Sequence, residues 1–197
     1  MADAKLQRRA RHQVRIIGGV WKRTTLPVLD RPGLRPTPNR VRETLFNWLG
    51  QDLSGWCCVD AFAGSGALGF EAASRGAREV LLVEQDATLV GQLRSLQSRL
   101  GASAVRVLHG DGIAVLRSRA AGSVGLVFLD PPFDSPRYDD AVQAALHALA
   151  PTGLLYLEAA RLWTTEQLQA HGLLLYRQLK AGAVVAHLLK IDPLRHA

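Results

Sequence analysis

Short apolar runs alternate with amphipathic stretches through most of the chain. The runs contain few polar residues, as is typical of strands buried on both faces of a parallel sheet. The intervening stretches repeat apolar residues at three- and four-residue intervals, which predicts helices. Strands alternating with helices indicate an α/β fold with a covered parallel sheet. The predicted strands are Cys57–Val59, Glu79–Glu84, Ala104–Leu108, Val124–Leu129 and Gly153–Glu158, and Leu173–Leu179 and Val184–Ile191 follow as a closing hairpin.

The N-terminal part of the chain has a different pattern. Two apolar runs, Val14–Ile17 and Val20–Leu26, flank Gly18-Gly19. Two glycines between such runs predict a β-hairpin with a two-residue turn. The preceding segment, Met1–Gln13, is rich in arginine and is expected to be a disordered basic arm.

A helix is predicted after a proline-rich connector. Thr37 is suited to cap it and Pro38 to be its first residue, because proline fits the first turn of a helix. Gly50 ends the pattern after Leu49. The predicted apolar face consists of Val41, Leu45, Trp48 and Leu49. We therefore divide the chain into an N-terminal extension, residues 1–50, and a main domain, residues 51–197.

Charge is unevenly distributed over the 197 residues. Residues 1–42 contain 11 of the 24 Lys and Arg but only two acidic residues, a net charge of +9, whereas the rest of the chain has a net charge of −2. This asymmetry predicts a polyanion-binding segment on a nearly neutral domain, although a tail that only aids solubility would look the same. The candidate phosphate-contacting residues are Arg15, Lys22, Arg23, Arg35, Arg40 and Arg42.

Other features of the composition narrow the protein class. No apolar run approaches the length of about 20 residues that spans a bilayer, so we expect no membrane segment. The two cysteines, Cys57 and Cys58, are adjacent, which suits neither a disulfide framework nor a zinc site. A cytoplasmic protein without a metal is therefore expected.

A glycine-rich turn follows the first strand of the main domain. Gly64 and Gly66 would let the backbone approach a ligand closely, and a helical pattern begins after them. With Gly69 the spacing matches the dinucleotide-binding fingerprint, so NAD is one candidate ligand. Asp60 ends the strand, and its carboxylate would repel a pyrophosphate but hold a ligand with a cationic amino group.

Four acidic residues follow successive predicted strands: Asp60, Glu84, Asp111 and Asp130. The carboxyl ends of parallel strands meet at one edge of a sheet, where ligands bind in α/β folds. Glu84 can accept hydrogen bonds from both hydroxyls of a ribose. Asp111, with Gly112 and Ile113 beside it, could accept from an adenine amino group, or it could only cap the next helix.

The segment Asp130-Pro131-Pro132-Phe133 suits chemistry on an amino group. Prolines stiffen the backbone and cannot join a hydrogen-bond ladder, so Asp130 and the Pro131 carbonyl can both accept from one amine. The lone pair of an exocyclic base amine is delocalised, and two acceptors would free it towards an electrophile. Phe133 could stack on a base, or it could belong to the core. Adenine N6, cytosine N4 and guanine N2 all fit this chemistry.

Together these segments resemble known families. Asp60, Gly64, Gly66 and Glu84 are similar to the S-adenosylmethionine site of Rossmann-like methyltransferases, and residues 130–133 resemble the motif of enzymes that methylate exocyclic amines. Adding residues 15–19, 35–37, 41–46 and 63–76, the chain from Arg15 onwards resembles the RsmD family.

The resemblance implies a Rossmann-like methyltransferase fold, with a mostly parallel seven-stranded sheet and an N-terminal β-hairpin extension. It implies methyl transfer from S-adenosylmethionine to guanine N2 of bacterial 16S ribosomal RNA. Implied catalytic residues are Asp130, Pro131, Pro132 and Phe133, and implied cofactor-binding residues are Asp60, Ala63, Gly64, Ser65, Gly66, Glu84, Asp111, Gly112 and Ile113.

A monomer that acts on a small-subunit particle is also expected. Two alternatives stay open at this point. One is an NAD-linked oxidoreductase, and the other is a non-catalytic RNA-binding factor for ribosome assembly.

Overall fold

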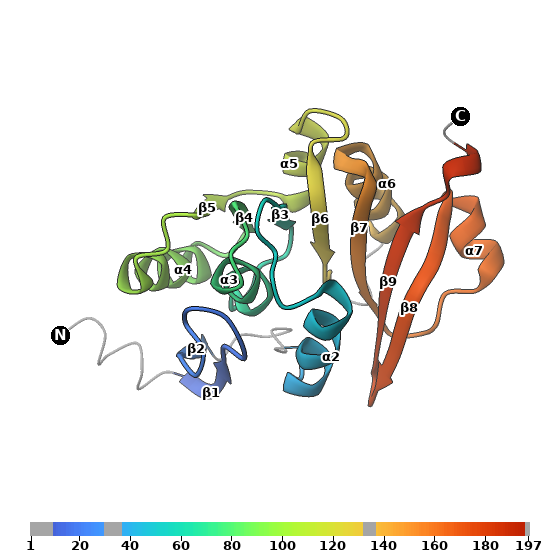
Figure 1. Cartoon of the computed structure of the whole chain (residues 1–197). Coiled ribbons are helices and arrows are strands. Elements are labelled where there is room, and N and C mark those ends of the chain that lie inside the picture. Colours follow the sequence, from blue (N-terminus) through green and yellow to red (C-terminus); the bar gives the residue numbers. More distant parts are fainter. Residues whose placement is uncertain (1–9, 30–36, 132–136, 196–197) are drawn as a thin grey trace.

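The computed structural model describes residues 10–29, 37–131 and 137–195 (Figure 1). Its centre is a seven-stranded sheet with the strand order β5-β4-β3-β6-β7-β9-β8. The strands are β3 (Cys57–Asp60), β4 (Glu79–Glu84), β5 (Val105–His109), β6 (Val124–Leu129), β7 (Leu149–Ala159), β8 (Leu173–Ala181) and β9 (Val184–Ile191). The strands from β5 to β7 run parallel, and β9 is antiparallel to both β7 and β8. The prediction of a mostly parallel seven-stranded sheet is confirmed.

Helices cover both faces of the sheet, because the strands are apolar on both sides. On one face lie α2 (Asn39–Leu49), α3 (Ala67–Ser74) and α4 (Ala87–Leu100), whose apolar residues share one buried cluster with β3, β4 and β6. On the other face lie α5 (Gly112–Ser118), α6 (Tyr138–Ala148) and α7 (Thr165–Ala170), which share a second cluster with the same strands. In the described ranges no helix is both long and apolar enough to cross a membrane.

The strand order changes direction between β3 and β6. The chain builds outward from β3 to β4 and β5, then returns to place β6 on the other side of β3. At such a switch point the connections leave the two strands in opposite directions, which opens a crevice beyond their carboxyl ends. Asp60 ends β3 and Asp130 directly follows β6, so both expected site residues lie at this crevice.

Most predicted elements differ from the observed ones by only one or two residues. The main exception is β7, which begins at Leu149 rather than Gly153 and follows α6 without a connecting loop. Its first residue pairs with Val124, and the register shifts before Leu126 pairs with Leu154. The irregular beginning of β7 has no alternating pattern, so the sequence does not predict it.

The predicted N-terminal hairpin is present, but its turn is not. Strands β1 (Ala10–Arg15) and β2 (Thr25–Leu29) pair antiparallel and are joined by residues 16–24 rather than by a two-residue turn. The expectation of a disordered arm up to Gln13 is also wrong, because β1 already begins at Ala10; residues 1–9 lie outside the described ranges. Gly19 serves a close contact instead: a Cβ there would lie 1.8 Å from the Ser74 carbonyl oxygen of α3.

Helix α2 begins one residue later than predicted. Pro38 is its N-cap residue and no side chain caps the helix. Thr37 is buried and its side chain instead hydrogen-bonds Glu158 of β7. The buried face of α2 contains Arg42 and Phe46, which the predicted apolar face did not include, whereas Trp48 is only partly buried.

Candidate functional site

The turn between β3 and α3 is held across the end of the sheet by backbone hydrogen bonds. Ala61 N–H donates to the Phe128 carbonyl of β6 at 3.1 Å, and Ala63 N–H donates to the Val83 carbonyl of β4 at 2.9 Å. Ala63 and Ser65 are buried within this turn, and Gly64 is partly exposed on it. The turn is therefore fixed at the end of β3, between the two neighbouring strands β4 and β6.

Gly66 has a different role from the one expected. Its φ is 78°, a left-handed conformation that favours glycine, and it is the N-cap residue of α3. A Cβ at this position would lie 2.6 Å from Leu93 and 2.7 Å from Phe70, both in the core. Gly66 therefore serves the turn and the helix packing, and its missing side chain does not make space for a ligand.

Glu84 lies beside the turn, as the sequence predicts. One carboxylate oxygen accepts from the Gly64 N–H at 2.9 Å and the other from the Asp86 N–H at 2.8 Å. These two bonds fix the plane of a partly exposed carboxylate. Each oxygen has two lone pairs, so both keep the capacity to accept from a ligand hydroxyl.

Asp111 is the N-cap residue of α5, one of the two roles that the sequence left open. Its carboxylate accepts from the backbone N–H groups of Ile113 at 2.8 Å and Ala114 at 3.4 Å. The other oxygen forms a 2.7 Å ion pair with Arg137. Gly112 is needed for packing, because a Cβ there would lie 1.9 Å from the Ala61 carbonyl oxygen. A contact of this segment with adenine stays a prediction.

Asp60 and Asp130 lie on either side of the switch point. The buried Asp60 carboxylate accepts from the Gly69 N–H of α3 at 3.1 Å. Pro131 is buried directly after Asp130. Within the described ranges no side chain or backbone N–H donates to the Asp130 carboxylate. Pro132 and Phe133, the other two expected catalytic residues, lie outside the described ranges.

Glu158 of β7 is a third carboxylate at this place, and it was not among the site residues predicted from the sequence. Its carboxylate accepts from the Tyr156 hydroxyl at 2.7 Å, and Thr37 also hydrogen-bonds it. The register pairs Leu129 with Leu157, which places Asp130 next to Glu158 on adjacent parallel strands. The signal was visible in the sequence, because Glu158 also ends an apolar strand.

Burial raises the pKa values of three carboxyl groups, which we call the acidic cluster: Asp60, Asp130 and Glu158. For Asp60 and Asp130 the charges of neighbouring carboxylates raise the pKa further. Burial is the main cause in each case. It raises the pKa of Asp60 to about 7, against a hydrogen bond from Gly69 that lowers it. Burial, then the charges of Glu158 and Asp60, raise the pKa of Asp130 well above its usual range.

The basic residues of the N-terminal extension divide into two groups. Arg15, Lys22, Arg23 and Arg40 are exposed, and Arg35 lies outside the described ranges. Arg42 was expected to contact phosphate, but its side chain is fully buried and forms an ion pair with Glu71 at 3.7 Å. It cannot reach a polyanion without leaving the core, so this expectation is wrong.

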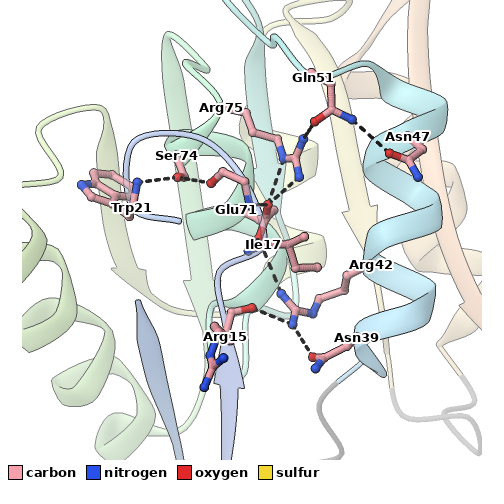
Figure 2. A network of polar contacts seen from close by, with 11 residues as sticks. Arg15, Ile17, Trp21, Asn39, Arg42, Asn47, Gln51, Glu71, Ser74 and Arg75 are labelled. Carbon is pink, nitrogen blue, oxygen red and sulfur yellow. Dashed lines mark hydrogen bonds and ion pairs between the residues drawn. The ribbon is translucent and has the colours of Figure 1, made fainter. Parts of the chain in front are cut away.

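The hairpin is fixed to α3 by a network of polar contacts around Glu71 (Figure 2). The Glu71 carboxylate accepts from the backbone N–H groups of Ile17 at 2.7 Å and Gly18 at 2.8 Å, and Arg75 pairs with it at 2.8 Å. Arg42 donates to the Arg15 carbonyl at 2.9 Å. These contacts therefore hold the exposed cations of the hairpin in a fixed position relative to α3.

Comparison with known proteins identifies the family. The sequence model of the family described as conserved hypothetical protein 95 matches residues 14–190. The chain belongs to this family. It is 42% identical to ribosomal RNA small subunit methyltransferase D of Escherichia coli over 75% of each chain, and 38% identical to the Haemophilus influenzae protein of the same name over 85% of this chain and 94% of the relative. The resemblance to the RsmD family is thus confirmed.

A solved structure supports the same relationship. The Escherichia coli protein yhhF, described as a methyltransferase, superposes with a TM-score of 0.78 at 38% sequence identity, covering 92% of this chain and 99% of that one. The Rossmann-like methyltransferase fold is therefore confirmed.

Proposed function

We propose that this protein transfers a methyl group from S-adenosylmethionine to the N2 amine of a guanine in bacterial 16S ribosomal RNA. The observation that carries the proposal is the acidic cluster at the switch point of a methyltransferase fold, next to the turn that Glu84 holds. Relatives named ribosomal RNA small subunit methyltransferase D support ribosomal RNA as the substrate. Guanine N2 is preferred because the family resemblance implies it.

The residues of the turn fit the cofactor. Glu84 would accept from the ribose hydroxyls, since its oxygens are held by backbone N–H groups and still have free lone pairs. Asp60 would attract the cationic amino group, and the segment from Asp111 to Ile113 would lie beside the adenine. S-adenosylmethionine supplies a methyl group that is already activated by its sulfonium. The protein therefore has to orient the two reactants and accept a proton, and it needs no metal.

Asp130 would hold the amine of the flipped base together with the Pro131 carbonyl. Methyl transfer forms a C–N bond while the C–S bond breaks, and the electron pair of that bond stays on sulfur. The amine then loses one proton, and the Asp130 carboxylate would accept it. Pro132 and Phe133 would complete the pocket, with the Phe133 ring stacked on the base.

The exposed cations of the hairpin would contact RNA phosphates. Arg15, Lys22, Arg23 and Arg40 belong to the rigidly held extension or to α2, and Arg35 lies between them in the sequence. We propose that residues 1–50 form this RNA-binding extension and residues 51–197 the catalytic domain, acting as a monomer on a small-subunit particle in the cytoplasm.

The test is direct identification of the product. The protein is incubated with methyl-labelled S-adenosylmethionine and small-subunit particles that lack the modification, and the RNA is digested and analysed by mass spectrometry. N2-methylguanosine is expected, whereas another labelled nucleoside would refute the guanine assignment. Calorimetry with NAD distinguishes the oxidoreductase alternative, since NAD binding as tight as that of S-adenosylmethionine would favour it. RNA binding without any methylation would favour an assembly factor.

A further inference from the structure

Glu158 is buried beside Asp130, although the reaction described above does not require it. Only 2% of the residue is exposed. A buried carboxylate is costly unless donors or cations compensate its charge. The structure supplies two donors, the Tyr156 hydroxyl and the Thr37 side chain, and both contact Glu158 rather than Asp130. The two neighbouring acids are therefore unequal, because one has donors and the other has none in the described ranges.

The groups that face this pair come from four elements. Asp60 of β3 adds a third carboxyl group, Tyr138 of α6 donates its hydroxyl to the Glu158 backbone carbonyl, and Tyr156 belongs to β7 itself. Arg42 of α2 is the cation near Tyr156, but it pairs with Glu71 and not with Glu158. The described residues thus include no cation bound to the pair. The described ranges also contain no group of three Asp, Glu, His or Cys side chains that could hold a metal ion.

We propose that Glu158 is a positioning residue that shares one proton with Asp130, and that Asp130 releases this proton when the cationic cofactor binds. The inference rests on the proposed function. In the free protein the charge lies on Glu158, where Tyr156 and Thr37 donate to it, and the proton lies on Asp130. A positive charge at the switch point then favours the ionised form of Asp130. The acceptor for the guanine amine is thereby created only after the cofactor is in place.

The shared proton couples cofactor affinity to pH in a defined direction. Below the pKa of the pair in the free protein, binding of the cofactor must displace a proton, so its affinity rises as the pH rises. Above that pKa the proton is already gone and the affinity no longer depends on it. The pKa belongs to the pair and not to either residue alone. The neutral product S-adenosylhomocysteine lacks the sulfonium charge and should show a weaker dependence.

The experiment is isothermal titration calorimetry of S-adenosylmethionine and S-adenosylhomocysteine with the full chain, between pH 5 and pH 9. Titrations in two buffers of different ionisation enthalpy give the number of protons released. Wild type should release more protons with S-adenosylmethionine than with S-adenosylhomocysteine. Failure of S-adenosylmethionine to bind at any pH would refute the proposed function itself, whereas binding without proton release would refute only this inference.

Two variants should move the midpoint of the pH dependence in opposite directions. Glu158→Gln removes the neighbouring negative charge, so Asp130 ionises more easily and the midpoint should fall by about one pH unit or more. Tyr156→Phe removes a donor from Glu158, so the pair holds its proton more tightly and the midpoint should rise. Glu166→Gln, an exposed acid on α7, is the matched control and should leave the midpoint unchanged.

A purely structural role of Glu158 would lower stability without moving the midpoint. An unchanged or higher midpoint in Glu158→Gln, or an unchanged or lower one in Tyr156→Phe, would overturn the proposal. Should either variant fail to fold, Asp130→Asn gives an independent test, because it should abolish the proton release that depends on Asp130. Persistence of the full wild-type release in Asp130→Asn would equally overturn the proposal.

Discussion

The Glu71 carboxylate and the acidic cluster lie on the same face of the sheet, and their surroundings differ. Glu71 is fully buried, but it is compensated by Arg42, Arg75 and two backbone N–H groups. In the acidic cluster Asp60 and Glu158 are also buried and Asp130 is partly buried. Neutral donors provide the compensation of this cluster, and Asp130 has none in the described part of the chain. In a structural contact the charge of a buried carboxylate is neutralised by cations and donors of the protein itself. In a reactive site part of that charge has no partner in the protein and can interact with a ligand.

The comparison explains how the two halves of the activity are separated. The Glu71 network joins the hairpin to α3 and so fixes the exposed cations of the hairpin, which we propose to contact RNA, relative to the central sheet (Figure 2). The acidic cluster is stabilised by little within the protein, and a cationic ligand would complete it. Under the proposed function, stability and activity depend on different carboxylates, and variants can separate them.

The largest effect is expected from Glu71→Ala. It removes the shared partner of two buried arginines and leaves their charges uncompensated, which costs about 3–5 kcal/mol of the free energy of unfolding. Urea denaturation measures this loss. Glu43→Ala, an exposed acid on α2, is the control and should change stability by less than about 0.5 kcal/mol. Equal effects of the two substitutions would show that the network is not a structural joint.

A smaller effect is expected from replacing Arg15, Lys22 and Arg23 by Ala. All three are exposed on the hairpin, so RNA affinity should fall when they are replaced. The slope of log binding constant against log salt concentration should become shallower by roughly 0.7–0.9 for each lost phosphate contact. Binding titrations at several salt concentrations measure both. Replacing Arg94, Arg106 and Arg117 removes the same charge elsewhere on the surface. An equal loss in that control would assign the effect to net charge alone.

The smallest effect is expected for the pH dependence of the free energy of unfolding, through Asp60. Burial raises the pKa of Asp60 from 3.8 to about 7, so the folded state binds more protons than the unfolded state between these values. Stability linked to Asp60 is therefore lost as the pH rises from about 4 to 7. Asp60→Asn should lack this loss and gain about 1 kcal/mol relative to wild type for each pH unit across that interval. A parallel pH dependence of unfolding in both proteins would show that Asp60 is ionised throughout.

The sequence predicted the central sheet and most of its helices well, because strands buried on both faces are apolar throughout and the acids that end them are conspicuous. It failed where an element depends on tertiary contacts. Gly18-Gly19 resembles a hairpin turn, yet the space beside Ser74 determines the glycine at position 19. Arg42 has the helical spacing of a buried residue but the charge of an exposed one, and only the position of Glu71 resolves the conflict.

Part of the candidate site could also be predicted from the pattern of the strands. Asp60, Glu84 and Asp130 follow predicted strands, and parallel topology alone brings them together. Glu158 was missed because no glycine or proline motif accompanies it. The donors Tyr156 and Thr37 come from positions 2 and 121 residues away, so no local pattern connects Thr37 with the site.

The most direct test of the account compares Asp130→Ala with wild type in methylation and in stability. Under single-turnover conditions with small-subunit particles, methylation should fall by about 10²–10⁴-fold, since the amine loses its charged acceptor. Thermal unfolding should show a melting temperature at or above that of wild type, because a partly buried carboxyl group without donors is removed. Near-normal methylation, or destabilisation as large as that of Glu71→Ala, would contradict the assignment of the acidic cluster to the reaction.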